Sequence, residues 1–303
     1  MTKKEVFEKL NNINIDTSKF MVIDTASLVC HGIIRKCDNL KVISLVDLNV
    51  SGIEVERVKN LEEYDEINGF LFRKLECFLN DDIDKSLKKK IELYLDCLDT
   101  YKNERELRSE GYTLIGGVDE VGRGPLVGPV VAACCILPEK FNLDGLTDSK
   151  KLSEKKRDYF YEEIKRQAIS YGIGIVSEKR IDEINIYEAT KEAMIMAINN
   201  CKVKPEYVLT DAMKLDLDIP VKPIIKGDLR SITISAASVL AKVTRDRMLY
   251  ELDEKYPMYD FKNNVGYPTK KHLEAINKYG IIDEHRRSYG PVKEYLEKKQ
   301  LNS

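Results

Sequence analysis

The stretch TLIGGVDEVGRGPLVGPVVAACCILP, residues 113–138, decides the fold. Two apolar segments, 113–119 and 127–138, have the length and composition of buried strands and flank a turn rich in glycine. Asp119 and Glu120 lie where the first of these strands ends. Because neighbouring residues on a strand point to opposite faces, only one of the two carboxylates is expected to face a given site directly.

The turn after these carboxylates contains Gly122, Arg123 and Gly124. An Asp-Glu pair before a glycine turn is most often just a charged strand end. The dense pattern Gly-Arg-Gly-Pro-x-x-Gly-Pro is much harder to explain as a turn alone. Glycine permits left-handed backbone and close approach to a ligand, and a guanidinium group is a rigid fork for phosphate. The pattern therefore indicates a ligand-binding loop.

Strands and helices alternate throughout the region after residue 110. Ser153 and Thr269 are the expected N-caps of two of the helices. Further strands are predicted at 171–177, 206–213 and 221–228, and helices at 153–170, 186–200, 232–256 and from 270 onward. This order predicts an α/β fold in which helices flank a mixed sheet.

The first 110 residues differ in pattern and are predicted to form a separate α+β extension. A short helix comes first, and LKVISLVDLNV (40–50) is typical of a strand followed by a turn. Apolar residues then recur at helical spacing, so 61–109 is predicted to be helical. GYTLIGG (111–117) interrupts that pattern, which places the domain boundary near residue 110, with domains 1–110 and 111–303.

Two more aspartates, Asp211 and Asp228, lie where predicted strands end. Each alone is usually a turn residue or a helix cap, but α/β proteins tend to place active sites at such ends. Together with Asp119 and Glu120 they would form a cluster of four carboxylates. Asp246 competes for the fourth position, but it lies in a predicted helix between two arginines, where ion pairing accounts for it.

A cluster of four carboxylates is costly unless a cation is present. Two carboxylates about 5 Å apart repel by about 3 kcal/mol at an effective dielectric constant near 20. Oxygen ligands suit Mg²⁺ or Mn²⁺ rather than zinc, and the chain has only three histidines. Two ions held by carboxylates are a common means of attacking a phosphodiester with water.

Basic and aromatic residues occur near these carboxylates in the sequence. Lysines are mostly solvated surface residues, but polar groups before a helix can bind phosphate. An aromatic residue on a turn usually serves packing, and its alternative role is stacking on a sugar or base. The candidates for nucleic-acid contacts are Ser149, Lys150 and Lys151 before one helix, Lys226 and Arg230 near Asp228, and Tyr267 between a glycine and a proline.

The composition is that of an ordinary globular protein, with 43% hydrophobic and 33% charged residues and a net charge of −2. Residues 1–110 carry 18 Lys/Arg and 22 Asp/Glu, a net charge of −4, so composition alone does not indicate nucleic-acid binding. The seven cysteines lack metal-binding spacing and are typical of reduced thiols, so we expect a cytoplasmic protein. The longest apolar run, VVAACCIL (130–137), is too short to span a membrane.

Taken together, these residues resemble a known family. GVDEVGRGPLVGPV, LTDSKKLS, INIYEATKEAM, LTDAM, IIKGD, SAASVLAKVTRDR and GYPTKKHLEAI occur in this order and resemble bacterial ribonuclease HII over residues 105–293. The resemblance implies an RNase H-like fold, with a mixed sheet flanked by helices and a C-terminal helical segment. It implies the activity of a type 2 ribonuclease H, which cuts the RNA strand of RNA/DNA hybrids. It also implies cutting 5′ of ribonucleotides embedded in duplex DNA, which leaves 5′-phosphate and 3′-hydroxyl ends, and a role in ribonucleotide excision repair.

The resemblance also implies roles for the candidate residues. Asp119, Glu120, Asp211 and Asp228 match catalytic carboxylates that hold two Mn²⁺ or Mg²⁺ ions, which would activate a water and stabilise the leaving oxygen. Gly122, Arg123 and Gly124 match a loop that contacts the ribose 2′-OH, the group that distinguishes RNA from DNA. Tyr267 matches a residue packed on the neighbouring deoxyribose. Ser149, Lys150 and Lys151 match phosphate contacts, and the Gly-Arg-Gly loop is absent from type 3 enzymes.

The chain departs from the family pattern at two places. Ala212 follows the third carboxylate where many members have glycine, although a small residue is retained. Residues 1–69 match nothing in the family, and we expect residues 1–110 to dock a protein partner or a second copy. Two other readings remain open: a nucleic-acid-binding module without activity, and a different carboxylate nuclease or phosphotransferase. Metal titration would test the former and an all-DNA substrate the latter.

Overall fold

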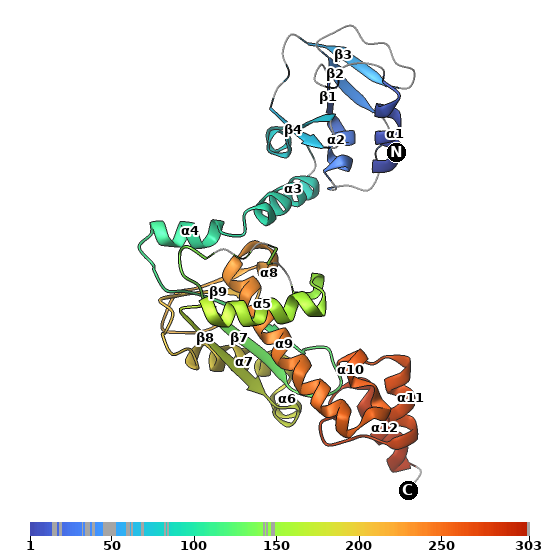
Figure 1. The fold of residues 1–303 in the computed structure, drawn as a ribbon. Helices are drawn as coiled ribbons and strands as arrows, with labels where there is room; N and C mark the ends of the chain where they lie inside the picture. Colours follow the sequence, from blue (N-terminus) through green and yellow to red (C-terminus); the bar gives the residue numbers. More distant parts are fainter. Residues whose placement is uncertain are drawn as a thin grey trace. The chain divides into compact units, whose positions relative to one another are not determined.

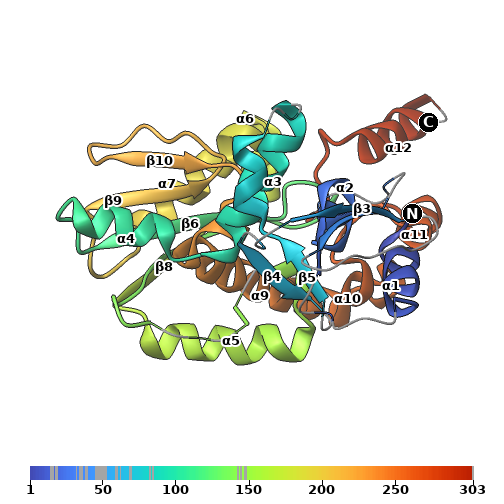
Figure 2. The same cartoon turned by 90° about the horizontal axis from the view of Figure 1, so that it is seen from above.

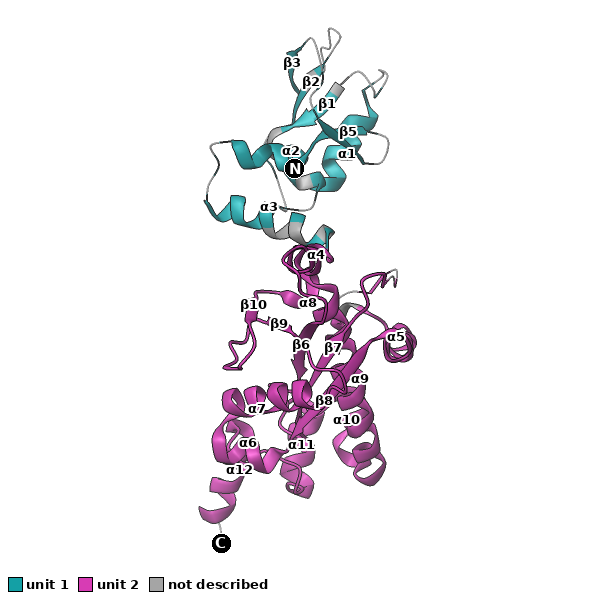
Figure 3. Cartoon of the chain, turned by 90° about the vertical axis from the view of Figure 1, so that its left-hand side faces the viewer, with its two compact units in different colours: residues 1–99 teal, residues 100–303 magenta. Residues whose placement is uncertain are grey.

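The chain folds into two compact units, Met1–Asp99 and Thr100–Ser303, which are coloured separately in Figure 3. This computed structural model describes residues 1–13, 17, 20–31, 33, 37, 40–44, 53–58, 61, 63–67, 70–81, 83, 85–141, 143, 145, 146 and 149–301. The division between the units comes before the predicted boundary near residue 110.

The first unit is a mixed α/β fold built around a five-stranded sheet in the order β3-β2-β1-β5-β4. The predicted strand at 40–50 is found as β2, while its residues 45–50 lie outside the described residues. Val6, Leu10, Val22, Val42 and Phe72 form the centre of its core. Its elements are α1 (Lys3–Asn11), β1 (Phe20–Ile23), α2 (Asp24–Cys30), β2 (Lys41–Ser44), β3 (Glu54–Arg57), β4 (Tyr64–Ile67), β5 (Phe70–Arg73), η2 (Leu75–Asn80) and α3 (Lys85–Leu98).

The prediction that 61–109 is helical was wrong for its first part. β4 and β5 form an antiparallel pair there, and β5 also pairs in parallel with β1. Strands of four residues are too short to show an alternating pattern against the helical spacing that follows, so only the pairing with β1 reveals them.

The second unit contains a five-stranded mixed sheet in the order β10-β9-β6-β7-β8. β6 pairs in parallel with β9, which pairs in parallel with β10, while β7 is antiparallel to both β6 and β8. The carboxyl ends of β6, β9 and β10 therefore meet at one edge of the sheet. The strands are β6 (Ile115–Val121), β7 (Val130–Ile136), β8 (Ser170–Val176), β9 (Tyr207–Asp211) and β10 (Val221–Ile224).

Helices cover both faces of this sheet (Figures 1 and 2). The alternation along β7 separates the two cores: Val131 and Ala133 pack with α9 (Ile232–Lys255) and α5 (Glu154–Gln167), whereas Val130 and Ala132 pack with α7 (Ile186–Asn199). α6 (Glu178–Ile184) precedes α7. The predicted α/β fold with a mixed sheet between helices is confirmed.

Helix α4 (Lys102–Ser109) belongs to the second unit, where its Glu104 and Leu107 are buried. Glu104 Oε1 accepts hydrogen bonds from the Ser231 hydroxyl at 2.6 Å and from the Thr233 hydroxyl at 2.7 Å, at the N-terminus of α9. Burial raises the pKa of Glu104. The continuous helical pattern of the sequence hides this change of unit between α3 and α4.

Ser153 and Thr269 cap α5 and α11 as predicted. The predicted strand at 221–228 was too long, because β10 ends at Ile224 and Lys226 takes a left-handed conformation. The short helix α8 (Gly227–Arg230) follows, so Asp228 lies in a helical turn rather than at a strand end.

The predicted C-terminal helical segment is present as η4 (Pro257–Tyr259), α10 (Phe261–Asn264), α11 (Lys270–Tyr279) and α12 (Gly290–Leu301). Its core contains two buried histidines whose tautomers follow from their partners. His285 Nδ1 accepts from the Ile282 N–H at 3.0 Å, so His285 Nε2 donates to His272 Nε2 at 3.2 Å. His272 then donates from Nδ1 to the Tyr267 carbonyl at 2.9 Å.

This histidine pair predicts a loss of stability in acid. Burial lowers the pKa of His285 from 6.5 to about 3 and also lowers that of His272. Because the unfolded chain binds these protons first, stability falls as the pH decreases below about 6.5. Between pH 7.5 and 5, His285 alone should account for a loss of about 2 kcal/mol in the free energy of unfolding. Denaturant unfolding at both pH values measures it, and an equal loss in His285→Gln would contradict it.

No helix in the described part of the chain is both long enough and apolar enough to cross a bilayer.

Candidate active site

Three carboxylates are brought together at the carboxyl ends of neighbouring parallel strands. Asp119 and Glu120 lie near the end of β6, and Asp211 ends β9. Val118 of β6 pairs with Thr210 of β9. Asp119 and Asp211 are the next residues on these two adjacent strands. Sequence patterns that predicted strand ends at these positions therefore identified residues that share one edge of the sheet.

The electrostatics show that these groups interact. Burial raises the pKa of Asp119 well above its ordinary value, and the charges of Glu120 and Asp211 raise it further. Burial also raises the pKa of Glu120, where Arg123 acts in the opposite direction and Asp211 adds to the increase. Both residues of the Asp-Glu pair thus experience the charge of Asp211, although they alternate along the strand.

Hydrogen bonds hold Asp119 and Asp211 in place. Asp119 Oδ1 accepts from the Glu120 N–H at 2.7 Å, and a bond with Ser238 of α9 opposes the increase in its pKa. Asp211 Oδ1 accepts from the Gly227 N–H at 2.8 Å, which ties the end of β9 to the start of α8. Asp228 is the next residue of α8 and is 9% exposed. The four predicted carboxylates therefore lie on three connected elements.

The donor set of this site fits a hard divalent cation. Glu120 Oε1 is 3.3 Å from Arg123 Nη1, while Glu120 Oε2 is buried and has no hydrogen-bond partner in the described part of the chain. A buried carboxylate oxygen without a partner is costly unless a cation or a proton meets it. Among the same described residues, no three Asp, Glu, His or Cys side chains are gathered into a group that could hold one ion. The assignment of a divalent cation to this site therefore rests on the chemistry and the burial of its carboxylates.

A buried arginine, Arg245, packs against the glycine loop, which consists of residues 122–129 between β6 and β7. Gly122 has φ +96°, and a Cβ there would come within 2.3 Å of Arg245 Nε. Arg245 is 1% exposed and donates to the carbonyls of Pro129, Val265 and Val127 at 3.0, 3.0 and 2.9 Å. Only glycine satisfies both the backbone angle and this close approach.

A second buried arginine, Arg286, donates to the Gly122, Arg123 and Gly128 carbonyls. Neither Arg245 nor Arg286 could be recognised from the sequence, because both lie in polar segments and the loop carbonyls that they bind are more than a hundred residues away. A weak signal was available, since each lies in a short run of charged residues that an amphipathic pattern would expose to solvent.

Tyr267 lies beside the glycine loop even though the two are far apart in sequence. A Cβ at Gly124 would be 3.2 Å from Tyr267 Cε1, so the ring covers this glycine. The Leu126 N–H donates to the Gly266 carbonyl at 2.8 Å and joins the two segments. The Tyr267 side chain remains 47% exposed, so it could also pack on a ligand.

The polar residues that were predicted to contact nucleic acid differ in their exposure and surroundings. Lys150 is close enough to lower the pKa of Glu120. The Ser149 hydroxyl is buried, 2.9 Å from the Ser238 hydroxyl, so it faces α9 rather than solvent. The Lys151 side chain and Asp148 lie outside the described residues. Lys226 is exposed and immediately precedes α8.

Comparison with known proteins identifies the family of this chain. The family model for ribonuclease HII matches residues 116–291. The curated ribonuclease HII sequences of Bacillus cereus (strain Q1) and Bacillus thuringiensis (strain Al Hakam) are each 60% identical over 201 residues, which are 66% of this chain and 78% of theirs. The chain belongs to the ribonuclease HII family.

Among solved structures, ribonuclease H2 from Pyrococcus horikoshii OT3 is 28% identical with a TM-score of 0.54, covering 61% of this chain and 98% of that chain. Membership of the ribonuclease HII family makes the protein a type 2 ribonuclease H, a hydrolase with endoribonuclease activity of a metal-dependent kind. The matched residues all lie within the second unit, so the first unit is an addition to the family domain.

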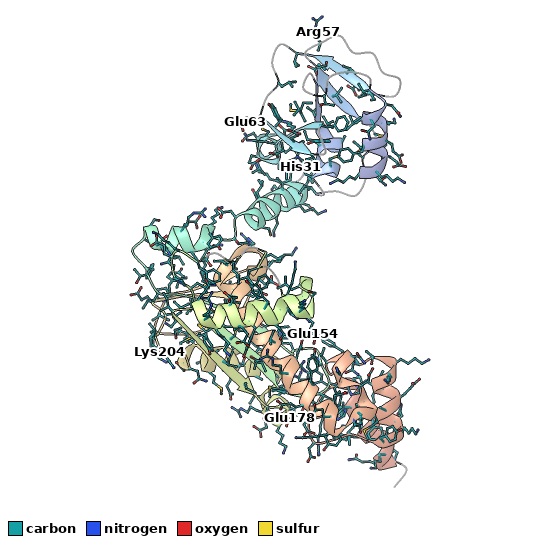
Figure 4. The ribbon with its side chains drawn as sticks, in the orientation of Figure 1. His31, Arg57, Glu63, Glu154, Glu178 and Lys204 are labelled. Atoms are coloured by element: carbon teal, nitrogen blue, oxygen red, sulfur yellow. The ribbon has the colours of Figure 1, made fainter. Side chains whose placement is uncertain are left out.

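Asp246, the competing fourth carboxylate, follows Arg245 on α9 and is buried. Its Oδ1 is 2.7 Å from Lys242 Nζ, one turn earlier on α9, which is the helical ion pairing expected from the sequence although with a different partner. It lines a cavity with Glu154 (Figure 4), Asp158 and other residues of α5 and α9. This environment favours Asp228 for the fourth position.

Ala212, which departs from the pattern of the ribonuclease HII family, has φ 54°. This left-handed conformation explains a preference for glycine here and costs alanine about 1 kcal/mol. We expect Ala212→Gly to raise the free energy of unfolding by about 0.5–1 kcal/mol, measured by denaturant unfolding. The control Ala189→Gly, inside α7, should lower it by about 1 kcal/mol. A loss of stability in Ala212→Gly would contradict the prediction.

Proposed function

We propose that the protein hydrolyses the RNA strand of RNA/DNA hybrids and cuts on the 5′ side of ribonucleotides embedded in duplex DNA. The observation that carries the proposal is that the carboxylates at the sheet edge lie next to the glycine loop. Glu120 and Arg123 are in contact at 3.3 Å, so the site for phosphodiester hydrolysis adjoins the site for the sugar. Ribonucleotide excision repair is the cellular role that such cutting would serve.

Asp119, Glu120, Asp211 and Asp228 are the residues that we propose to hold divalent ions, either Mn²⁺ or Mg²⁺ and two in number during catalysis. When bound, such ions lower the pKa of an attacking water and stabilise charge on the leaving oxygen. The buried Glu120 Oε2 without a partner in the described part of the chain supports this assignment. Cutting 5′ of a ribonucleotide would leave a 3′-hydroxyl on the DNA and a 5′-phosphate.

The residues around the carboxylates would position the nucleic acid. We assign Gly122, Arg123 and Gly124 to the ribose 2′-OH, since that hydroxyl is the group by which a protein distinguishes RNA from DNA. The exposed ring of Tyr267, beside Gly124, would pack on the adjacent deoxyribose. Lys150, Lys151 and Lys226 would contact phosphates, and Ser149 would do so through its backbone, because its hydroxyl is buried.

The test is cleavage of an end-labelled DNA duplex that contains one ribonucleotide, with and without Mn²⁺ or Mg²⁺. We expect metal-dependent cutting 5′ of the ribonucleotide and none of an all-DNA duplex. An RNA/DNA hybrid tests the other substrate class. Cutting of the all-DNA duplex at the same rate would indicate a different carboxylate nuclease. Absence of cutting together with tight duplex binding would indicate a binding module.

Arg123→Ala should weaken discrimination more than general binding. The side chain is 47% exposed and pairs with Glu120, so its loss leaves the fold intact. We expect kcat/KM for the one-ribonucleotide duplex to fall about 10–100-fold, while affinity for an all-DNA duplex changes by less than about threefold. Titration by fluorescence anisotropy measures the affinity. Equal losses on both duplexes would argue against a role in recognition.

We also propose that residues 1–110 bind a protein partner or a second copy of the chain. Their first 99 residues form a unit with its own sheet and core, outside the family match. Light scattering of the full chain over a range of concentrations separates these cases. A mass above 34.8 kDa supports self-association. An unchanged mass together with unchanged activity after deletion of residues 1–69 would count against the proposal.

A further inference from the structure

The carbonyl oxygens of Gly122, Arg123 and Gly128 all accept from one buried guanidinium group. Arg286 is fully buried. It donates from Nη2 to the Gly122 carbonyl at 2.6 Å and from Nη1 to the Arg123 carbonyl at 3.0 Å. Its Nε and Nη2 also donate to the Gly128 carbonyl at 2.9 and 2.8 Å. One side chain therefore fixes both ends of the loop.

Tyr289 completes this arrangement. Its hydroxyl donates to the Arg123 carbonyl at 2.6 Å and accepts from Arg286 Nη1 at 2.9 Å. The Arg123 carbonyl thus accepts two hydrogen bonds from the segment 286–289. Such a carbonyl resists rotation, because any rotation of its peptide plane breaks both bonds.

The segment that carries these two side chains is itself anchored. The Asp182 carboxylate, in α6, accepts from the Arg287 and Ser288 N–H groups at 2.8 and 2.9 Å. The Arg286 N–H donates to the Leu126 carbonyl at 2.8 Å. The segment is consequently held by α6 on one side and by the loop residue Leu126 on the other, and its attachment to α6 does not depend on the loop.

The direction of the carbonyls determines the direction of the N–H groups. In a planar trans peptide the C=O and the following N–H point in opposite directions. Because the Gly122 and Arg123 carbonyls face Arg286, the N–H groups of Arg123 and Gly124 point away from it. Neither N–H donates a hydrogen bond within the described part of the chain, and both residues are exposed.

We infer that Arg286 and Tyr289 are positioning residues, which orient the Arg123 and Gly124 N–H groups towards the substrate ribose and thereby set the preference for a 2′-OH. The inference rests on the proposed function, since it specifies how the glycine loop performs the recognition. Neither side chain touches the reacting atoms. A merely structural role would stabilise the fold without affecting the choice between ribose and deoxyribose.

Tyr289→Phe is the variant that tests this inference. It removes only the hydroxyl, and the ring keeps its packing in the core. We expect kcat/KM for a one-ribonucleotide duplex to fall about 10-fold, because a small displacement of aligned groups has effects of this size. The inhibition constant of an all-DNA duplex used as competitor should change by less than about twofold.

Tyr295→Phe is the matched control, because Tyr295 is a partly buried tyrosine of α12 in the same core and has no hydrogen bond to the loop within the described part of the chain. It should leave both constants unchanged. Arg286→Lys keeps the charge but loses the fork that reaches three carbonyls, so its effect on kcat/KM should exceed that of Tyr289→Phe. Circular dichroism and the melting temperature establish that each variant is folded.

The outcomes separate the inference from the proposed function. A selective wild-type enzyme with an unchanged Tyr289→Phe variant would overturn the inference and leave the proposed function standing. Equal changes on the ribonucleotide duplex and the DNA competitor would also overturn it, in favour of a structural role. A wild-type enzyme that does not distinguish the two duplexes would remove the proposed function, and the inference with it.

Discussion

An Asp119→Asn variant is expected to fold normally and to lose at least about 10³-fold in kcat. Asp119 is 6% exposed, and its pKa is raised by burial and by the charges of Glu120 and Asp211. The amide oxygen of asparagine can still accept the hydrogen bond from the Glu120 N–H. It cannot supply the negative charge that a divalent cation requires. Single-turnover cleavage of a one-ribonucleotide duplex measures the loss.

The same substitution should increase stability in the absence of divalent ions. A group whose pKa is raised in the folded state stabilises at low pH, and this contribution is lost as the pH rises through the folded pKa. At pH 8, far above the ordinary pKa of an aspartate, the burial of Asp119 therefore opposes folding, and asparagine removes that cost. We expect a melting temperature higher by about 2–4 °C. Addition of Mn²⁺ or Mg²⁺ should stabilise the wild type more than the variant.

Asp246→Asn is the matched control for this prediction, because Asp246 is equally buried but pairs with Lys242. Its kcat should stay within about threefold of the wild type, since its carboxylate is paired with Lys242 one turn earlier on α9 and is not among the four that we propose to hold divalent ions. Normal turnover in Asp119→Asn would remove Asp119 from the catalytic group. A large loss of kcat in Asp246→Asn would instead reopen its claim to the fourth position.

The contrast between Asp119 and Asp228 illustrates what sequence patterns reveal. Asp119 follows an apolar segment that forms a buried strand, so its place at the sheet edge follows from local composition. Asp228 was expected at a strand end for the same reason. The strand stops at Ile224, because Lys226 is left-handed and Gly227 donates to Asp211. That hydrogen bond joins two segments, and no local pattern encodes it.

Partners that are distant in sequence account for most of what could not be predicted. Glu104 anchors α4 to α9 through Ser231 and Thr233, which moves the unit boundary ahead of residue 110. β4 and β5 exist because β5 pairs with β1. Arg245 and Arg286 bind the glycine loop through backbone carbonyls, which carry no side-chain signature. The glycine pattern predicted a constrained loop, but the residues that constrain it could be identified only from the folded structure.

Gly122→Ala should have the second large effect, through strain rather than charge. A Cβ at this position would lie 2.3 Å from Arg245 Nε, 2.6 Å from Arg245 Cδ and 2.8 Å from the Pro129 carbonyl. The φ of +96° is also unfavourable for alanine. We expect a decrease of about 2–4 kcal/mol in the free energy of unfolding and a fall of about 100-fold or more in kcat/KM. Denaturant unfolding and cleavage kinetics measure the two.

Arg245 cannot yield to the new methyl group without breaking hydrogen bonds, because its guanidinium donates to three carbonyls while buried. The loop must therefore move instead, which displaces the carbonyls held by Arg286. Gly124→Ala provides the comparison: its Cβ would be 3.2 Å from the exposed Tyr267 ring, which can rotate away. That variant should lose less than about 1 kcal/mol. Equal stabilities of the two variants would show that Arg245 does not confine the loop.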